Sequence, residues 1–351
     1  MDMSYDDYIG LDDYNFGEET VETSIYLYVY PVLLTFGGVG NILSATLLRH
    51  FIHRSVSTCF YLIVVSVLDL IVLLIRCGND WLRATTTYDL SQRLMVYSDI
   101  ICKVYPFVFN AALHCSKWLL VAMAIEGAIA TACPARVATA CTLARAKAAI
   151  LLLAVLLICV NMHYFWSYEL VEINDFGMFV KTCTFTMYGH YASEMFVENV
   201  FPLINLLLSD ILPEVFIFGC VVIMAVSVTR GRHRGDKKLR EWQAKYLLDS
   251  ESLDCLKVTF MVISLCYVIL MLPTFAFTLF LQLVEKPGYV RYTYKYDRQK
   301  NLALVICAVS ENVFLSFKFF VYVATLPRFR THLGQLFTWC GSHRHHTNAI
   351  P

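Results

Sequence analysis

Charged side chains recur inside stretches of this sequence that are otherwise apolar. They are Asp69, Lys117, Glu126, Asp210, Glu214, Glu311 and Lys318. A charge in an apolar interior is costly, so such groups are normally paired or functional. Asp210 and Glu214 stand four positions apart, which places both carboxyl groups on one face of a helix. These residues predict ion pairs between helices or a path for protons. The sequence contains no HExxH, GxSxG or P-loop motif, so we expect no enzyme activity and no cofactor.

The composition indicates a protein that crosses a membrane several times. Of its 351 residues, 58% are hydrophobic and 16% are charged. An average soluble domain carries about 25% charged residues. The net charge is zero, which argues against a nucleic-acid partner. The 13 cysteines lie mostly in apolar runs and form no CxxC pair, so the sequence predicts no zinc site.

Seven apolar segments are each near or above the length that a membrane-spanning helix needs. They are about 25–48, 57–76, 102–132, 147–166, 203–229, 256–284 and 301–325. Helices are required because the backbone in lipid must satisfy its own hydrogen bonds. Phe329, Leu333, Leu336 and Phe337 then recur at helical spacing, which predicts a helix lying on the membrane. We expect an all-α membrane protein, a seven-transmembrane helix bundle with a short amphipathic eighth helix.

The distribution of basic residues predicts the orientation. With the N-terminus outside, the inner connections carry 14 Lys and Arg residues and the outer ones carry 8. Residues 1–24 contain eight acids and no Lys or Arg. We therefore expect an acidic extracellular tail at 1–24, a membrane bundle at 25–325 and a cytoplasmic helix and tail at 326–351.

Short motifs in these segments follow the order and spacing of a known family. They are Gly40-Asn41, Leu68-Asp69, Cys102, Glu126, Pro134, Cys183, Pro213, Pro273 and Tyr322. On these residues the chain resembles the rhodopsin-like G-protein-coupled receptors from residue 25 to about 337. The stretches WLLVAMAIE (118–126) and NMHYFW (161–166) are similar to invertebrate FMRFamide-like and chemosensory peptide receptors.

The resemblance implies a plasma-membrane receptor that binds an extracellular ligand and repacks its helices to engage a heterotrimeric G protein, an arrestin or both. The acidic tail favours a basic or amidated neuropeptide. Tyr5, Tyr8 and Tyr14 stand beside acids in that tail and are candidates for sulfation. The resemblance also implies a disulfide between Cys102 and Cys183; the alternative is two free thiols.

Several residues depart from the family pattern. Gly127 replaces the arginine that contacts the G protein in the family, and Met271 stands where a tryptophan is usual. Lys318 replaces an asparagine, and Val221 falls where a tyrosine supports the active state. These departures leave open a second interpretation, a decoy, scavenger or heterodimer partner without standard coupling. A transporter is a third, although the sequence shows no internal repeat.

The family position of a sodium pocket falls on Asn41, Asp69 and Ser116. We expect Lys318 to enter this pocket, pair with Asp69 and take the place of the ion, so that no metal is held there. The alternative is that Lys318 extends to the inner membrane surface.

Lys117 and Pro213 belong by resemblance to the layer beneath the ligand pocket. We expect Lys117 to pair with either Asp210 or Glu214; the alternative is that water solvates each charge. Glu126 lacks its usual arginine neighbour. It is expected to bond Arg145 or loop backbone, or to be protonated.

The family positions that surround the outer cavity predict the ligand-binding residues. They are Phe109, Asn110, Leu113, His114, Asn205, Thr274, Phe277, Thr278 and Glu311. We favour Glu311 as an unpaired acid that attracts a cation, and His114 as a second polar contact; the alternative for His114 is a satisfied core residue. Cys340, just beyond the eighth helix, is a candidate for palmitoylation or a free thiol.

Overall fold

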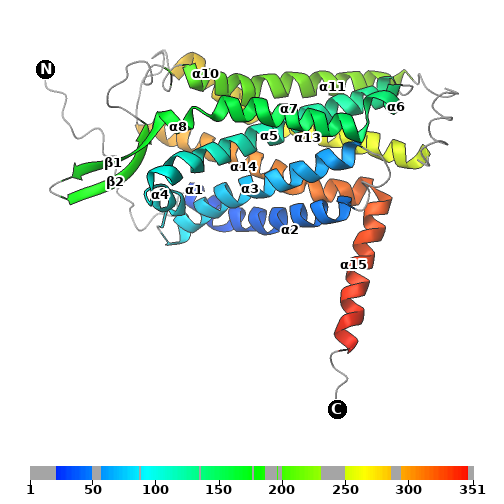
Figure 1. The fold of residues 1–351 in the computed structure, drawn as a ribbon, viewed down its shortest axis with the longest axis horizontal. Coiled ribbons are helices and arrows are strands. Elements are labelled where there is room, and N and C mark those ends of the chain that lie inside the picture. The colour runs from blue at the N-terminus through cyan, green and yellow to red at the C-terminus, as the bar shows by residue number, and fades with distance from the viewer. Residues whose placement is uncertain are drawn as a thin grey trace.

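The computed structural model describes residues 21–49, 57–86, 88–133, 136–175, 178–185, 196, 200–230, 250–285 and 294–346. The three tyrosines proposed for sulfation, most of the acidic tail and Pro134 lie outside the described residues. Seven described helical segments are long and apolar enough to cross a membrane, and they run roughly side by side along one axis (Figure 1). The predicted seven-helix bundle is therefore confirmed.

The seven segments are built from the following elements. The first comprises α1 (Val21–Ser24), the π-helical turn η2 (Ile25–Val29) and α2 (Tyr30–Leu48); the second is α3 (Ser57–Thr86); the third is α5 (Asp99–Ala132). The fourth comprises α7 (Leu143–Asn161) and α8 (Tyr164–Ser167); the fifth comprises α10 (Phe201–Asn205), η6 (Leu206–Ile211) and α11 (Leu212–Thr229). The sixth comprises α13 (Ser250–Phe280) and η7 (Leu281–Glu285), and the seventh is α14 (Tyr294–Thr325).

Six of the seven spans agree with the expected limits to within about five residues. The second span does not, because α3 continues to Thr86 although we expected an end near residue 76. Arg76 lowers the hydropathy there, but its charge is paired with Glu311 of α14. A charge that finds a partner does not end a helix, so the prediction of that boundary was wrong.

The two ends of the bundle carry different elements (Figure 1). One end holds α4 (Leu90–Met95) and an antiparallel hairpin of β1 (Tyr168–Asp175) and β2 (Met178–Phe185). The other holds α6 (Val137–Ala140) and α15 (Pro327–His346). We call these the hairpin end and the α15 end. The hairpin differs from the expected all-α fold; β-branched and aromatic residues in both segments favour the pairing.

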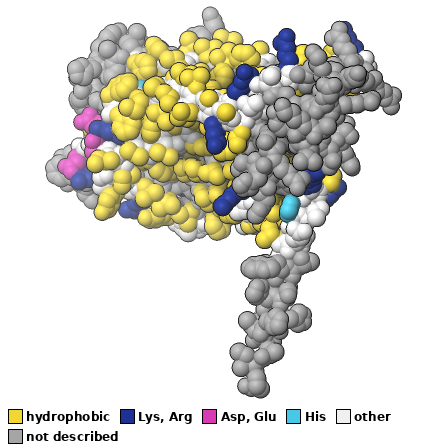
Figure 2. Space-filling view, turned by 45° about the vertical axis from the view of Figure 1, so that its right-hand side comes forward, with side chains coloured by type: hydrophobic (Ala, Val, Ile, Leu, Met, Phe, Trp, Pro, Cys, Tyr) yellow, Lys and Arg dark blue, Asp and Glu magenta, His cyan; other side chains and the backbone are white. Residues whose placement is uncertain are grey.

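The third span forms the centre of the bundle. Of its most apolar stretch, 67% is buried, compared with 11% for the fourth span. The fourth span instead exposes apolar side chains such as Leu151, Leu152 and Val155. Figure 2 shows hydrophobic side chains gathered over the helices on one face, as a lipid-facing surface requires, and acidic ones at the hairpin end. Charged residues of α5 must therefore find partners inside the protein.

The first span packs closely on the seventh because glycine leaves room for it. A Cβ atom at Gly40 would lie 2.9 Å from the Cβ of Phe319. Beside this contact, Asn41 donates a hydrogen bond from Nδ2 to the carbonyl of Leu315 at 3.1 Å. Asn41 thus ties α2 to α14.

Proline shapes the fifth span. Pro213 lies at the start of α11, directly after the π-helical turn η6. Proline has no N–H for the preceding turn and its ring crowds the carbonyl four residues earlier, which favours a widened turn there. Asp210 lies in this turn and Glu214 follows Pro213.

The eighth helix begins at Pro327 and leaves the bundle at a steep angle (Figure 1). Phe329 is fully buried against the rings of Tyr322 and Phe319. Arg330 donates hydrogen bonds from Nη1 to the carbonyls of residues 323 and 324 at the end of α14. The side chain of Cys340 lies outside the described residues, so its lipidation stays a prediction.

Candidate functional site

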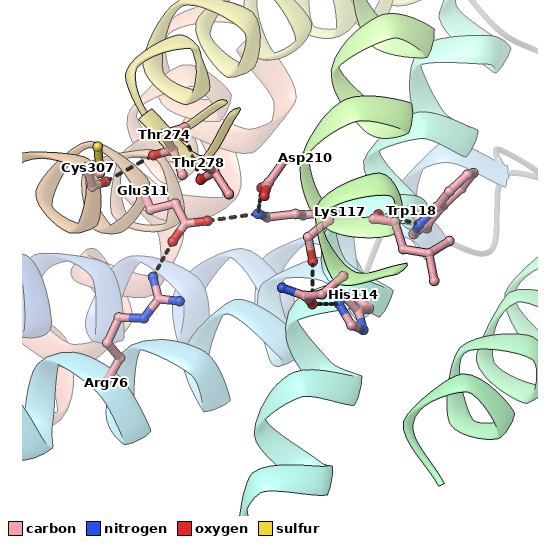
Figure 3. Close-up of polar contacts among 12 residues, drawn as sticks. Arg76, His114, Lys117, Trp118, Asp210, Thr274, Thr278, Cys307 and Glu311 are labelled. Atoms are coloured by element: carbon pink, nitrogen blue, oxygen red, sulfur yellow. Dashed lines mark hydrogen bonds and ion pairs between the residues drawn. The ribbon is translucent and has the colours of Figure 1, made fainter. Parts of the chain in front are cut away.

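Four charged side chains from four spans form a line of ion pairs inside the bundle (Figure 3). Arg76 of α3 pairs with Glu311 of α14. Glu311 also contacts Lys117 of α5, with Oε1 2.8 Å from Nζ. The same Nζ lies 3.3 Å from Oδ1 of Asp210 in η6. We call these four residues the ion-pair chain. It holds two cations and two anions, so its charges balance.

The position of Glu311 corrects one expectation. We expected an unpaired acid that attracts a cationic ligand, but Glu311 already contacts two cations. Arg76 causes the difference, and it was not among the expected site residues. Its signal was a cation at the apparent end of the second span, which hydropathy treats as a boundary. Glu311 therefore joins helices in this structure and is not a free ligand contact.

Lys117 contacts Asp210, one of the two partners that the sequence left open. Glu214, the other, is buried within electrostatic range of Lys117 and Asp210. Neither of its carboxyl oxygens has a hydrogen-bond partner among the described residues.

His114 lies fully buried between two amides. Its Nε2 is 2.9 Å from Oδ1 of Asn205, and its Nδ1 is 2.9 Å from Nδ2 of Asn161. An amide NH₂ donates and an amide oxygen accepts, so this arrangement fits a neutral imidazole with its proton on Nε2. His114 is thus a satisfied core residue here, the alternative that the sequence left open, because both of its ring nitrogens have partners.

The remaining expected ligand residues divide between the sixth span and α5. Thr274 donates to the carbonyl of Cys307 at 3.4 Å, and Thr278 donates to the carbonyl of Thr274 at 2.7 Å. Phe277 stacks on Phe280. Asn110 donates to the carbonyl of residue 106 at 2.9 Å, and Leu113 packs partly buried against the core.

A cavity of about 290 Å³ opens at the hairpin end between α4, α5 and the hairpin. Its lining includes Tyr105, Phe109, Asn110, Tyr168 and Phe185, and none of its lining residues is charged. Burial raises the pKa of the Tyr168 phenol, which keeps this hydroxyl protonated. Phe109 also contacts the ion-pair chain, because its ring centroid lies 5.5 Å from the guanidinium carbon of Arg76. Phe109 therefore connects the cavity with the ion-pair chain.

The hairpin is held to the third span by a disulfide between Cys102 and Cys183, whose Cα atoms are 5.6 Å apart. The alternative of two free thiols does not hold in this structure. The bond fixes β2 above the start of α5 and limits the freedom of the hairpin that lines the cavity.

A second pair lies deeper, at the predicted sodium position. Lys318 of α14 pairs with Asp69 of α3, and Ser116 donates to Oδ1 of Asp69 at 2.6 Å. The side chains of Lys318 and Asp69 are 1% and 0% exposed, so Lys318 does not extend to the membrane surface. Its ammonium also lies 4.4 Å from the ring centroid of Phe314. Asn41, the third expected member, bonds α14 backbone instead of Asp69.

Glu126 and Gly127 lie towards the α15 end of α5. Oε2 of Glu126 accepts a hydrogen bond from Ser57 at 2.7 Å, and Ser57 was not among the expected partners. A Cβ at Gly127 would lie 2.9 Å from the Cβ of Phe260 in α13. Glycine thus permits close contact between the third and sixth spans. Burial raises the pKa of the neighbouring Cys141 thiol to about 12, and Glu126 acts in the same direction.

Two of the expected switch residues lie in the core of the bundle, whereas a third, Pro273, is exposed on the sixth span. Met271 and Tyr322 are buried, at 5% and 0% exposure, and Pro273 lies inside the continuous helix α13. Val221 packs partly buried against the core. Met271 and Tyr322 thus contribute to the hydrophobic core of the bundle.

The arrangement can be compared with known proteins. No curated protein matches the sequence. The family model described as "7 transmembrane receptor (rhodopsin family)" matches residues 40–326, which is most of the chain and includes the ion-pair chain, the disulfide and the Asp69–Lys318 pair. The invertebrate peptide-receptor subgroup has no such support. With seven spans in this order and a match of this extent, the chain belongs to the rhodopsin family of seven-transmembrane receptors.

Proposed function

We propose that this chain is a plasma-membrane receptor whose hairpin end faces outside and binds an extracellular ligand. Binding shifts the packing of the spans, and the α15 end transmits the change to a heterotrimeric G protein, an arrestin or both. Family membership supports the receptor function. The distribution of basic residues in the connections supports the orientation.

The observation that carries the proposal is that Phe109 both lines the cavity and contacts Arg76 of the ion-pair chain. A ligand in the cavity meets Phe109, whose ring lies against Arg76. Arg76 leads through Glu311 to Lys117 and so joins the second, seventh and third spans. A ligand shifts an equilibrium only through contacts that differ between two packings. Displacing Phe109 and Arg76 supplies such a difference.

The ligand that fits best is a basic or amidated neuropeptide. The eight acids of residues 1–24 attract cationic groups to the hairpin end. The cavity itself takes the uncharged part of the ligand, because its lining is aromatic and amide-bearing. With the cationic part of the ligand attracted by the acidic tail and its uncharged part bound in the cavity, the ligand needs no direct contact with Glu311.

The test is a screen of basic and amidated peptides on cells that express the tagged chain, with G-protein and arrestin readouts. We expect a peptide that activates the wild type and loses potency on Phe109→Ala. Phe107→Ala is the matched control, because Phe107 is on the same helix but packs against Phe165. A hit whose potency is equal in both variants would contradict the cavity as the binding site. Binding to the cell surface without either readout would favour the decoy.

A further inference from the structure

Glu214 is a buried acid beside the ion-pair chain for which the described residues provide no hydrogen bond. It is 8% exposed, and both of its oxygens are buried without a partner. It follows Asp210 by four residues across Pro213. Lys117 and Asp210 act on it electrostatically. An unpaired carboxyl group in such a place is unusual and needs an explanation.

The balance of charges in the ion-pair chain explains why Glu214 has no partner. Arg76 and Lys117 already neutralise Glu311 and Asp210. An ionised Glu214 would add a fifth, uncompensated charge to a buried cluster. An isolated buried carboxylate costs so much free energy that the group instead keeps its proton. A protonated carboxyl group leaves the cluster neutral, which matches the lack of a cationic partner of its own.

We propose that Glu214 is a proton-binding site, and that loss of its proton draws Lys117 away from Glu311 and towards the acids of the fifth span. The step is a simple ionisation: the O–H bond breaks, the proton goes to water, and the carboxylate keeps the electron pair. Glu311 remains paired with Arg76. The contact between the third and seventh spans weakens, and that between the third and fifth spans strengthens. The proposal does not depend on any ligand or G protein.

The spacing of the two acids makes such a transfer possible. Asp210 and Glu214 are separated by about 6 Å along the helix, one turn, on the same face. Lys117 carries a flexible four-carbon side chain whose ammonium can rotate between acceptors. Its Nζ is already 3.3 Å from Asp210, the longer of its two contacts. A small rotation of the side chain would bring it towards Glu214.

Other titratable groups face this site from the packed elements. Tyr267 of α13 is buried within electrostatic range of Lys117 and Glu214. His114, one turn before Lys117 on α5, is held by two amides. The described residues contain no group of three or more His, Cys, Asp or Glu that could hold a metal ion. A hard cation prefers several oxygen ligands, so a proton fits this site better than a metal.

The proton can be observed by infrared spectroscopy, because a protonated carboxyl group has a carbonyl band that a carboxylate lacks. The full-length chain in lipid nanodiscs, without ligand, is titrated with pH. We expect a band that disappears on raising the pH and is absent in Glu214→Gln. The matched control is Glu172→Gln, an exposed hairpin residue paired with Lys181, in which the band should remain. His114→Gln should also retain the titration.

Two further measurements keep the test decisive. Labelling with ¹³C-glutamate should shift the band in the unmutated chain, which assigns it to a glutamate independently of the folding of Glu214→Gln. The titration is also repeated in sodium chloride and in choline chloride at equal ionic strength. A band that persists in Glu214→Gln, or fails to shift with the label, would overturn the proposal. A band lost on adding sodium at constant pH would identify a metal site instead.

Discussion

Replacing Lys318 by asparagine removes the cation that now neutralises Asp69. Both side chains are at most 1% exposed, and Ser116 is the neutral group that donates a hydrogen bond to Asp69. Removing one partner of a buried ion pair costs about 3–5 kcal/mol, because the remaining charge has no compensation. At a shift of about 2–4 °C per kcal/mol, we expect the melting temperature to fall by about 6–20 °C.

The same change should make the receptor sensitive to sodium. The lost ammonium leaves space beside a carboxylate and a serine hydroxyl, which are suitable ligands for a hard cation. A bound ion stabilises the folded state by about 2.7 kcal/mol when its concentration is 100 times its dissociation constant. Sodium chloride should therefore raise the melting temperature of Lys318→Asn relative to choline chloride, and should leave the wild type unchanged.

The assay is thermal unfolding of the purified chain in lipid nanodiscs, followed by a thiol-reactive dye or by light scattering. The double variant Asp69→Asn, Lys318→Asn is the control, because it holds neither charge. We expect it to be more stable than Lys318→Asn and indifferent to sodium. The reasoning is refuted if sodium stabilises the wild type as strongly as Lys318→Asn, or if the single variant costs less than about 1 kcal/mol, as for an exposed pair.

Three other predictions concern contacts near the two ends of the bundle. Gly127→Arg should lower surface expression, because a Cβ at this position would lie only 2.9 Å from the Cβ of Phe260. Adding Phe260→Gly should restore expression. Equal expression of the single and double variants would show that this contact is unimportant. Cys102→Ser should cost about 2–5 kcal/mol by breaking the bond to Cys183, and a reducing agent should lower the melting temperature of the wild type but not of the variant. Burial raises the pKa of Cys141 to about 12. The rate of its labelling by maleimide, measured as the difference from Cys141→Ser, should therefore rise about tenfold per pH unit between pH 7 and 10. A plateau near pH 9 would contradict this.

Hydropathy was sufficient to predict the seven spans, because lipid imposes the same length and apolar character on each of them. It failed at Arg76, where a local average cannot detect a partner 235 residues away. It gave no sign of the hairpin either. The eight-residue strands β1 and β2 owe their position partly to the bond between Cys102 and Cys183, which the resemblance implied but hydropathy cannot show.

The candidate site shows the same limit. The sequence placed Asp210 and Glu214 on one face and could not choose between them as partners of Lys117. The choice follows from the widened turn that precedes Pro213 and from the packing of α5 against it. Likewise, the role of Glu311 depends on which cations reach it, and that is a property of four packed helices. Spacing identifies the candidates, but packing assigns the partners.

The two buried lysines each have acidic partners in the structure. Lys318 would be a costly buried charge without Asp69, and Lys117 would be one without Asp210 and Glu311. Each of these charges would cost several kcal/mol if it lost its partner, so the pairs help to fix this packing.

The contact at Gly127 has a consequence for signalling. The third and sixth spans meet there through Phe260, and the described contacts at this point involve no arginine. Separating the two spans therefore requires exposing an aromatic ring, whose burial is worth about 1.5–3 kcal/mol. That cost depends little on salt, unlike the breaking of an exposed ion pair. In this structure the third and sixth spans are thus joined by apolar packing towards the α15 end, whereas ion pairs join the spans at the centre of the bundle.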